Sequence, residues 1–131
     1  MFRTASIALL ILAAGTALAG PPQKISECNT TITDPGKYKV VRDLACPDGE
    51  MGIKILASDV KLDLHGHTIS CETPVRSGVI VGDRDAPEVF SNVRISNGAV
   101  TGCAIGVLLN FTDGARVTKM ELSSNAESAI T

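Results

Sequence analysis

Residues 59–71 read DVKLDLHGHTISC, and residues 92–103 read NVRISNGAVTGC. Each segment starts with Asp or Asn before Val, alternates apolar with polar residues, passes through a Gly and ends at a Cys. The alternation places Val60 and Leu62 on one face of a strand and Lys61 on the other, because successive side chains of a strand point to opposite sides. The two segments therefore predict one short β-unit that is written twice.

A second kind of short apolar strand recurs between units of the first kind. Its members begin at Gly52, Gly78, Gly106 and Ser128, at intervals of 26, 28 and 22 residues. The first kind recurs at Val60, Val93 and Val117, at intervals of 33 and 24 residues. Two alternating strand types with a shared period indicate an all-β solenoid, in which each unit buries its apolar face against the next. The polar segment 82–88 accounts for the widest interval and is expected to be an external loop.

The first 19 residues have the features of a secretory signal peptide: Arg3, an apolar run over residues 7–14, and Ala17 and Ala19 around the cleavage position. The run is shorter than the roughly 20 residues that span a bilayer. Cleavage after Ala19 would leave 112 of the 131 residues, with 11 basic and 14 acidic residues, in a secreted or periplasmic chain. Basic and acidic residues are interspersed along the sequence, which argues against nucleic-acid binding and membrane insertion.

All four cysteines are predicted to form disulfides rather than a metal site, because their number is even, the chain is expected to be exported and no C-x-x-C spacing occurs. Superposition of the two opening segments matches Val60 with Val93, Leu62 with Ile95, Gly66 with Gly98 after a slip of one residue, and Cys71 with Cys103. Neighbouring strands lie about 4.8 Å apart, and disulfide-linked Cα atoms lie about 4.4 to 6.8 Å apart. Cys71 and Cys103 are therefore expected to bridge adjacent coils.

Cys28 and Cys46 would then close an N-terminal loop. We interpret residues 35–38 of this loop as a turn between strands at residues 31–33 and 39–41. A bond from Cys28 or Cys46 to Cys71 remains the alternative.

The segments 52–55, 59–69, 78–81, 92–98 and 106–109 together resemble the repeats of right-handed parallel β-helix proteins, the pectin-lyase-like superfamily. The resemblance covers roughly residues 50–131. After the signal peptide at 1–19, it implies a lead-in or cap segment at 20–50 and about three β-helix coils at 51–131. A β-helix needs its open end covered, and the next strand starts only at residues 128–131, so we expect the chain to be truncated at its C-terminus.

The resemblance also implies a module of an exported protein that binds or remodels polysaccharide; the alternative is a structural, adhesive or accessory scaffold without catalysis. The superfamily includes polysaccharide lyases, glycoside hydrolases and epimerases. The Asn-Thr-Asp, Asp-Asp and Arg-Ile-Lys patterns of its polygalacturonase-like members are absent from this sequence. An enzyme of this kind would carry its catalytic coils beyond Thr131.

Several residues are candidates for chemistry. Asp59 and Asp63 lie four residues apart, about 13 Å along a strand, which exceeds the roughly 5 to 9.5 Å of a glycosidase pair. We interpret them, with His65, as a solvated outer face. His67 has the pKa range of a general base, but a structural role at a corner is the preferred interpretation.

Hard oxygen ligands for calcium occur in the loop at Asp83, Asp85 and Glu88. Arg84 counts against a tight cage, so solvated loop charges are the preferred interpretation and no cofactor is assigned. Asn97 and Asn125 are expected to satisfy backbone groups at corners. The sequons at Asn29 and Asn110 would matter only in a eukaryotic secretory pathway.

Overall fold

The computed structural model describes residues 21–74, 76–86, 88–126 and 128–130. The described residues form a parallel β-solenoid of about four turns and contain no helix, which confirms the predicted all-β stacking. The solenoid has one turn more than the sequence indicated, because residues 23–46 also pair in register with the later coils. The predicted signal peptide lies outside the described residues.

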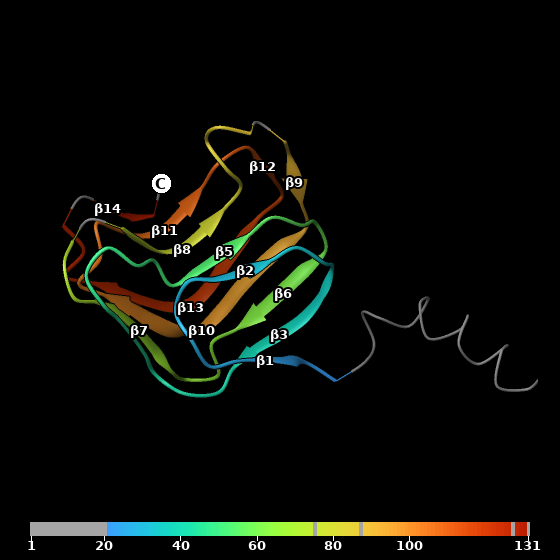
Figure 1. The fold of residues 1–131 in the computed structure, drawn as a ribbon. Helices are drawn as coiled ribbons and strands as arrows, with labels where there is room; N and C mark the ends of the chain where they lie inside the picture. Colours follow the sequence, from blue (N-terminus) through green and yellow to red (C-terminus); the bar gives the residue numbers. More distant parts are fainter. Residues whose placement is uncertain (1–20, 75, 87, 127, 131) are drawn as a thin grey trace, which may run out of the picture.

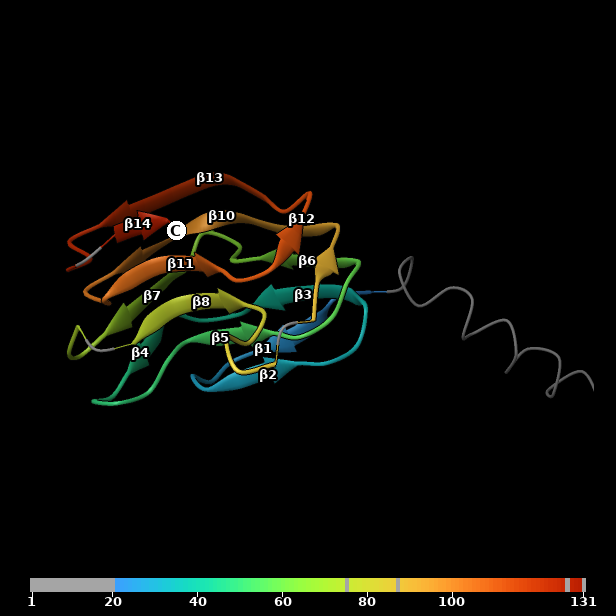
Figure 2. The ribbon, with the colours of Figure 1, turned by 90° about the horizontal axis from the view of Figure 1, so that it is seen from above.

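Two parallel sheets run along the solenoid (Figures 1 and 2). Sheet A contains β1 (Gln23–Ile25), β3 (Gly36–Val40), β6 (Val60–Asp63), β10 (Val93–Thr101), β7 (Thr68–Cys71) and β4 (Leu44–Cys46), with β13 (Arg116–Ser123) paired to β10. Sheet B contains β2 (Thr30–Ile32), β5 (Ile53–Ile55), β8 (Ser77–Val81), β11 (Ile105–Leu109) and β14 (Ser128–Ile130). The short strands β9 (Phe90–Ser91) and β12 (Thr112–Asp113) pair at one corner.

The core consists of aliphatic columns, in which equivalent residues of successive coils lie over one another. Val60 pairs with Val93 and Leu62 with Ile95, as the sequence predicts. All four of these side chains are at most 1% exposed. The polar residues that alternate with them face outward, so the strand pattern alone separates the core from the surface.

Sheet A has two halves, one with β3 and β6 and the other with β4 and β7. The corner between these halves differs in length from coil to coil. Asp63 pairs with Ser96, but Thr68 pairs with Ala99, so residues 64–67 of one coil correspond to residues 97–98 of the next. The predicted slip of one residue at this corner is therefore too small, because the offset changes by two. β10 and β13 pass through the shorter corner as continuous strands, whereas the longer corner separates β6 from β7.

The N-terminal segment also corrects one prediction. Residues 36–38, predicted as part of a turn, belong to β3, and the connection from β2 to β3 is confined to residues 33–35. β2 and β3 lie in different sheets and each pairs with the following coil. Tyr38 is buried in β3, and burial of an apolar ring outweighs the turn preference of the preceding Pro-Gly pair.

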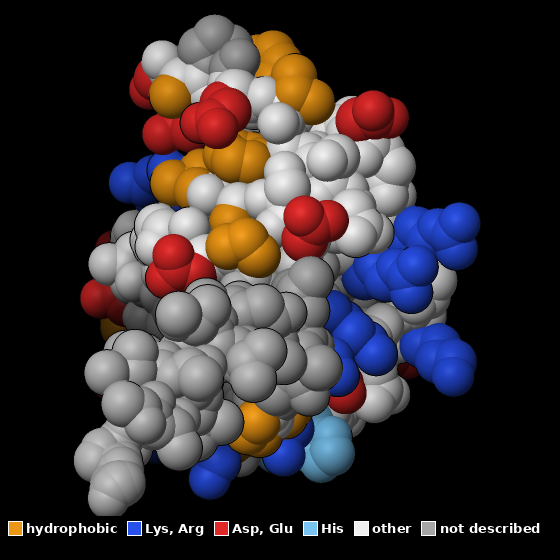
Figure 3. All heavy atoms as spheres, turned by 90° about the vertical axis from the view of Figure 1, so that its right-hand side faces the viewer, with side chains coloured by type: hydrophobic (Ala, Val, Ile, Leu, Met, Phe, Trp, Pro, Cys, Tyr) orange, Lys and Arg blue, Asp and Glu red, His pale blue; other side chains and the backbone are white. Residues whose placement is uncertain are grey.

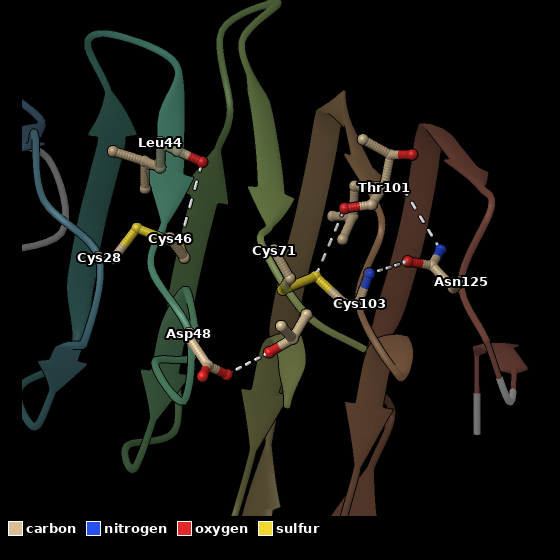
Figure 4. Close-up of a disulfide and its surroundings, with 10 residues drawn as sticks. Cys28, Leu44, Cys46, Asp48, Cys71, Thr101, Cys103 and Asn125 are labelled. Atoms are coloured by element: carbon tan, nitrogen blue, oxygen red, sulfur yellow. Dashed lines mark hydrogen bonds between the residues drawn. A yellow bond between two sulfur atoms is a disulfide. The ribbon is translucent and has the colours of Figure 1, made fainter. Parts of the chain in front are cut away.

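The four cysteines stack at one corner (Figure 4). Disulfides join Cys28 to Cys46, with Cα atoms 5.6 Å apart, and Cys71 to Cys103, with Cα atoms 4.8 Å apart. Both disulfides match the pairing that the sequence analysis favoured. Cys46 is also the register partner of Cys71, so the two disulfides occupy successive positions of a single column.

The residues that lie just before β6, β10 and β13 form a second column, and they adopt left-handed backbone angles. Asp59 has a φ of 58°, Asn92 of 56° and Gly114 of 76°. Asp, Asn and Gly are the residue types that tolerate this conformation best. The Asn92 Nδ2 also donates to Asp59 Oδ1 at 2.8 Å, which ties the corner of one coil to the next.

Gly52 marks the close approach of two coils. A Cβ at this position would lie 2.2 Å from the backbone oxygen of Gly78. We expect Gly52→Ala to lower the free energy of unfolding by about 1–3 kcal/mol, because overpacking forces the backbone to shift. Gly114→Asn is the control: nothing lies within 4 Å of its Cβ position, and Asn92 already adopts the same conformation one coil away. Urea unfolding of both variants checks this, and equal losses would contradict it.

Candidate functional site

A row of four cations crosses the outer face of sheet A, and we call it the basic ladder. Its members are Lys37, Lys61, Arg94 and Arg116, on β3, β6, β10 and β13. Each is the register partner of the next, so the ladder presents one cation per coil. Neighbouring strands place successive rungs about 4.8 Å apart at the backbone.

No carboxylate neutralises this ladder within the part of the chain that the structure describes. The ion pairs found there join Lys54 to Asp83 and His67 to Asp43. Lys37 is half-buried, and the other three rungs are exposed. Like charges directly opposite one another destabilise a sheet. The ladder therefore costs stability, which no described contact offsets.

The surrounding surface is also basic. We call the outward residues of β1, β3, β6, residues 93–96 of β10 and residues 116–118 of β13 the basic face; its charged members are Lys24, Lys37, Lys39, Lys61, Asp63, Arg94 and Arg116. Six cations and one carboxylate give it +5, whereas the whole chain is −2, so the remainder is −7. Figure 3 shows Lys and Arg gathered on the side where β3, β6 and β10 lie in Figure 1.

An open groove follows three rungs of the ladder. Its lining residues are Gly36, Lys37, Asp59, Val60, Lys61, Asn92 and Arg94. The left-handed column of Asp59 and Asn92 forms one border, and Asp63 lies outward on β6 on the other side of Lys61. The groove therefore has a cationic floor with polar borders, which suits an extended anionic ligand.

The two carboxylates that the sequence analysis paired, Asp59 and Asp63, lie at two different corners of the coil. Asp59 lies in the turn before β6 rather than on the strand, and its Oδ1 accepts from Asn92. Asp63 Oδ1 accepts from the His65 backbone N–H at 2.7 Å and from Asn97 Nδ2 at 3.3 Å. Each carboxylate therefore has its own partners. Asn97 lies at this corner, but its side-chain amide donates to the Asp63 carboxylate and not to the backbone group that the sequence analysis expected, and its backbone oxygen accepts from the Gly66 N–H.

Asn125 extends the cysteine column by one coil, as predicted for a corner amide. Its side chain accepts from the Cys103 backbone N–H at 3.1 Å and donates to the Val100 carbonyl at 3.3 Å (Figure 4). Of the two sequon residues, Asn29 is exposed in a left-handed turn and Asn110 is half-buried.

His67 lies at the corner between the halves of sheet A, with a partner that the sequence did not indicate. Its Nδ1 is 3.2 Å from Asp43 Oδ1, and the same oxygen accepts from the Thr68 backbone N–H at 3.0 Å. The Thr68 hydrogen bond and then the His67 hydrogen bond lower the pKa of Asp43. Asp43 is 24 residues from His67 in sequence, so only the coil register brings the two together. No hydroxyl or thiol of the described residues hydrogen-bonds His67. The contact between His67 and Asp43 therefore holds the corners of two neighbouring coils together.

The acidic loop does not assemble a cation site among the residues that the structure describes. Asp83 accepts from the Asp85 backbone N–H at 2.9 Å and from Lys54 Nζ at 3.4 Å, and these contacts lower the pKa of its carboxyl group. Asp85 and Glu88 are exposed. No group of three or more His, Cys, Asp or Glu side chains that could hold a metal occurs in the described ranges.

No protein-family model matches the chain, and the comparisons with curated proteins and with solved structures also give no match. Within residues 21–130, apart from the three undescribed positions, no helix is long and apolar enough to cross a membrane.

The Asp43 corner gives a test by titration. In His67→Phe the pKa of Asp43 should rise but remain below its ordinary value, because the stronger cause, the Thr68 N–H, persists. The native state favours the carboxylate, so its contribution to stability is present above the ordinary pKa and is lost as pH falls through the lowered one. Carbon-detected NMR of the Asp43 carboxyl measures the change. His65→Phe, which removes no Asp43 contact, is the control; an unchanged pKa in His67→Phe would refute the assignment.

The cost of the ladder gives a second test. Arg94→Gln should raise the free energy of unfolding by about 0.2–1 kcal/mol at low ionic strength, because Arg94 faces a cation on both sides. The gain should shrink between about 0.01 M and about 1 M salt, where the Debye length falls from about 30 Å to about 3 Å. Lys54→Gln is the matched control: it loses the Asp83 partner and should bring no gain. Urea unfolding at both salt concentrations measures the effect, and a loss of stability in Arg94→Gln would contradict the repulsion.

Proposed function

We propose that the chain is an exported module that binds an acidic polysaccharide on the basic face of sheet A. The observation that supports this function is the basic ladder, four cations in register without carboxylate partners among the described residues. An extended polyanion would relieve the repulsion between the rungs. Binding would thus recover the stability that the unliganded ladder loses.

The distribution of charge favours a polyanion over a neutral glycan. The basic face carries +5 on a chain of −2, so an anionic ligand is attracted to this face and repelled by the rest of the surface. A nucleic acid fits less well, because proteins that bind single strands stack bases on exposed aromatic rings. Tyr38, the aromatic residue on the strands of this face, is only 7% exposed.

Export is supported by the two disulfides, which persist in oxidising compartments, and by the signal-peptide pattern of residues 1–19. The finer assignment is a right-handed helix of the pectin-lyase-like superfamily. It is supported by the sequence resemblance and by the strand order, in which each coil contributes to sheet B and then to both halves of sheet A. Parallel strands joined by crossovers adopt the right hand in nearly all known sheets.

Polygalacturonate binding by the purified mature chain tests the proposal. We expect retention in affinity electrophoresis that weakens as salt screens the exposed charges. Lys61→Glu with Arg94→Glu should lower the affinity about tenfold or more, because two attractive contacts become repulsive. Arg76→Glu with Arg84→Glu makes the same charge change in the groove over sheet B and should leave the affinity within about twofold.

Three outcomes would contradict the proposal. Equal losses in both double variants would show that net charge, and not the basic face, governs binding. Tighter binding of single-stranded DNA at equal ionic strength would replace the polysaccharide with a nucleic acid. Failure to bind any acidic or neutral polysaccharide would favour the structural or adhesive scaffold.

A further inference from the structure

We infer that the cysteine column is a thiol–disulfide relay, in which a small thiol reacts at one end and a cysteine thiol is released at the other. The column holds one cysteine per coil, in the order Cys28, Cys46, Cys71 and Cys103 (Figure 4). The two disulfides bridge its outer spacings, and the middle spacing carries no bond. This inference is independent of the proposed binding function.

The middle spacing fits a disulfide as well as the outer two. Cys46 and Cys71 are register partners on neighbouring parallel strands, which places their Cα atoms about 4.8 Å apart. The existing disulfides join Cα atoms 5.6 Å and 4.8 Å apart. Disulfide-linked Cα atoms in general lie about 4.4 to 6.8 Å apart. The native backbone therefore already supplies the separation that a bond between Cys46 and Cys71 needs.

The surface between the two middle cysteines is open. One groove is lined by Ala45, Cys46, Pro47, Ser70, Cys71 and Glu72. Cys71 is half-buried, and Cys46 is 2% exposed, so Cys46 reaches the groove only at its edge. A sulfur that turns across this groove displaces solvent and not a packed side chain.

Cys28 is the sulfur of the first disulfide that an external thiol can reach. Exchange begins when a thiolate attacks one sulfur of a disulfide, and access helps to decide which sulfur is attacked. Cys28 is half-buried and borders a second open groove, whereas its partner Cys46 is almost fully buried. Attack at Cys28 leaves the small thiol bound there and frees the buried cysteine.

The relay consists of two exchanges that balance without an oxidant. First, the thiolate of a low-molecular-weight thiol, such as reduced glutathione, bonds to Cys28 Sγ, the disulfide to Cys46 breaks, and Cys46 leaves as a thiolate. Second, Cys46 Sγ bonds to Cys71 Sγ, the disulfide to Cys103 breaks, and the electron pair stays on Cys103 Sγ. The proton that the small thiol gave up ends on Cys103. Two disulfide bonds are present before and after.

The order of the column favours the second exchange and ends it at Cys103. A thiolate attacks along the line of the bond that breaks, and Cys46 lies on the opposite side of Cys71 from Cys103 (Figure 4). The next position of the column is Asn125, whose side chain accepts from the Cys103 backbone N–H. The Thr101 carbonyl oxygen lies 3.6 Å from Cys103 Sγ and is an acceptor for the released thiol.

The exchange changes which coils are covalently joined. The native disulfides fasten the first coil to the second and the third to the fourth. The relayed bond fastens the second coil to the third and leaves both outer coils without a disulfide. A small thiol would therefore alter the end of the column that it does not touch.

Serine variants test the middle spacing without an added thiol. Cys28→Ser frees Cys46 beside Cys71, and Cys103→Ser frees Cys71 beside Cys46. Each variant should hold the Cys46–Cys71 bond in an amount between about one tenth and ten times that of the remaining native bond. The reason is that the spacings are alike and that the thiol freed in either state is similarly buried.

Two further serine variants are the matched controls. Cys46→Ser frees Cys28, and Cys71→Ser frees Cys103, and neither freed thiol has a disulfide next to it in the column. Both controls should keep the remaining native bond. Alkylation of free thiols, digestion and mass spectrometry identify each bond, because trypsin separates the four cysteines into peptides 25–37, 43–54, 62–76 and 95–116.

Brief treatment of the unsubstituted chain with reduced glutathione tests the direction of the relay. Alkylation should then find glutathione on Cys28, the alkyl label on Cys103 and a bond between Cys46 and Cys71. The same treatment in urea should give all three pairings of the four cysteines, because unfolding removes the register that keeps non-neighbouring cysteines apart.

Three outcomes would overturn the relay. A label on Cys46 with the Cys71–Cys103 bond intact would show that the second exchange does not occur. Glutathione on Cys71 in place of Cys28 would show that the entry point is wrong. If Cys28→Ser and Cys103→Ser keep their native bond as completely as the controls do, the middle spacing cannot be bridged. Urea unfolding shows that each variant is folded, and the glutathione experiment depends on no variant.

Discussion

In-register parallel pairing of successive coils is the constraint on which the whole structure depends. It places Val60 over Val93 and Leu62 over Ile95, so buried apolar side chains of successive coils lie over one another. The same constraint acts at the corners. A left-handed position recurs before β6, β10 and β13, and it is occupied by Asp59, Asn92 and Gly114, residue types that tolerate this conformation. A residue in this fold is therefore selected by its column as much as by its neighbours in sequence.

The disulfides show how the constraint acts on covalent chemistry. Cys46 and Cys71 are register partners in adjacent coils, but each bonds to the cysteine on its other side. The two bonds thus fasten coils in two separate pairs, and backbone hydrogen bonds and apolar packing join these pairs. Asn125 replaces a further cysteine at the end of the column and satisfies the backbone groups of Cys103 and Val100. Disulfides and the side-chain amide of Asn125 are two ways of linking successive coils at the same corner.

The alternation around Val60 and Val93 was sufficient to predict the register of β6 with β10, and the matched cysteines predicted the disulfide between their coils, because both signals lie within short segments. The turn at residues 35–38 was predicted wrongly: Pro-Gly favours a turn locally, but burial of Tyr38 in the column of Leu62 extends the strand to Gly36. Asp43 beside His67 had no local signal, since the two are adjacent only through the stacking of coils. Length changes at corners are equally hard to predict, because backbone turns of two and four residues both return the chain to the same column.

The basic ladder is invisible in the linear sequence for the same reason that it is continuous in space. Its rungs are separated by 24, 33 and 22 residues, and acidic residues lie between them, so the sequence looks evenly charged. The coil register places these residues on adjacent strands, so the like charges lie one strand spacing apart. The neighbouring outward column combines Lys39 with Asp63, so opposite charges are compatible with this sheet. Four cations in the ladder are therefore not imposed by the fold, and the polyanion binding that we propose would account for them.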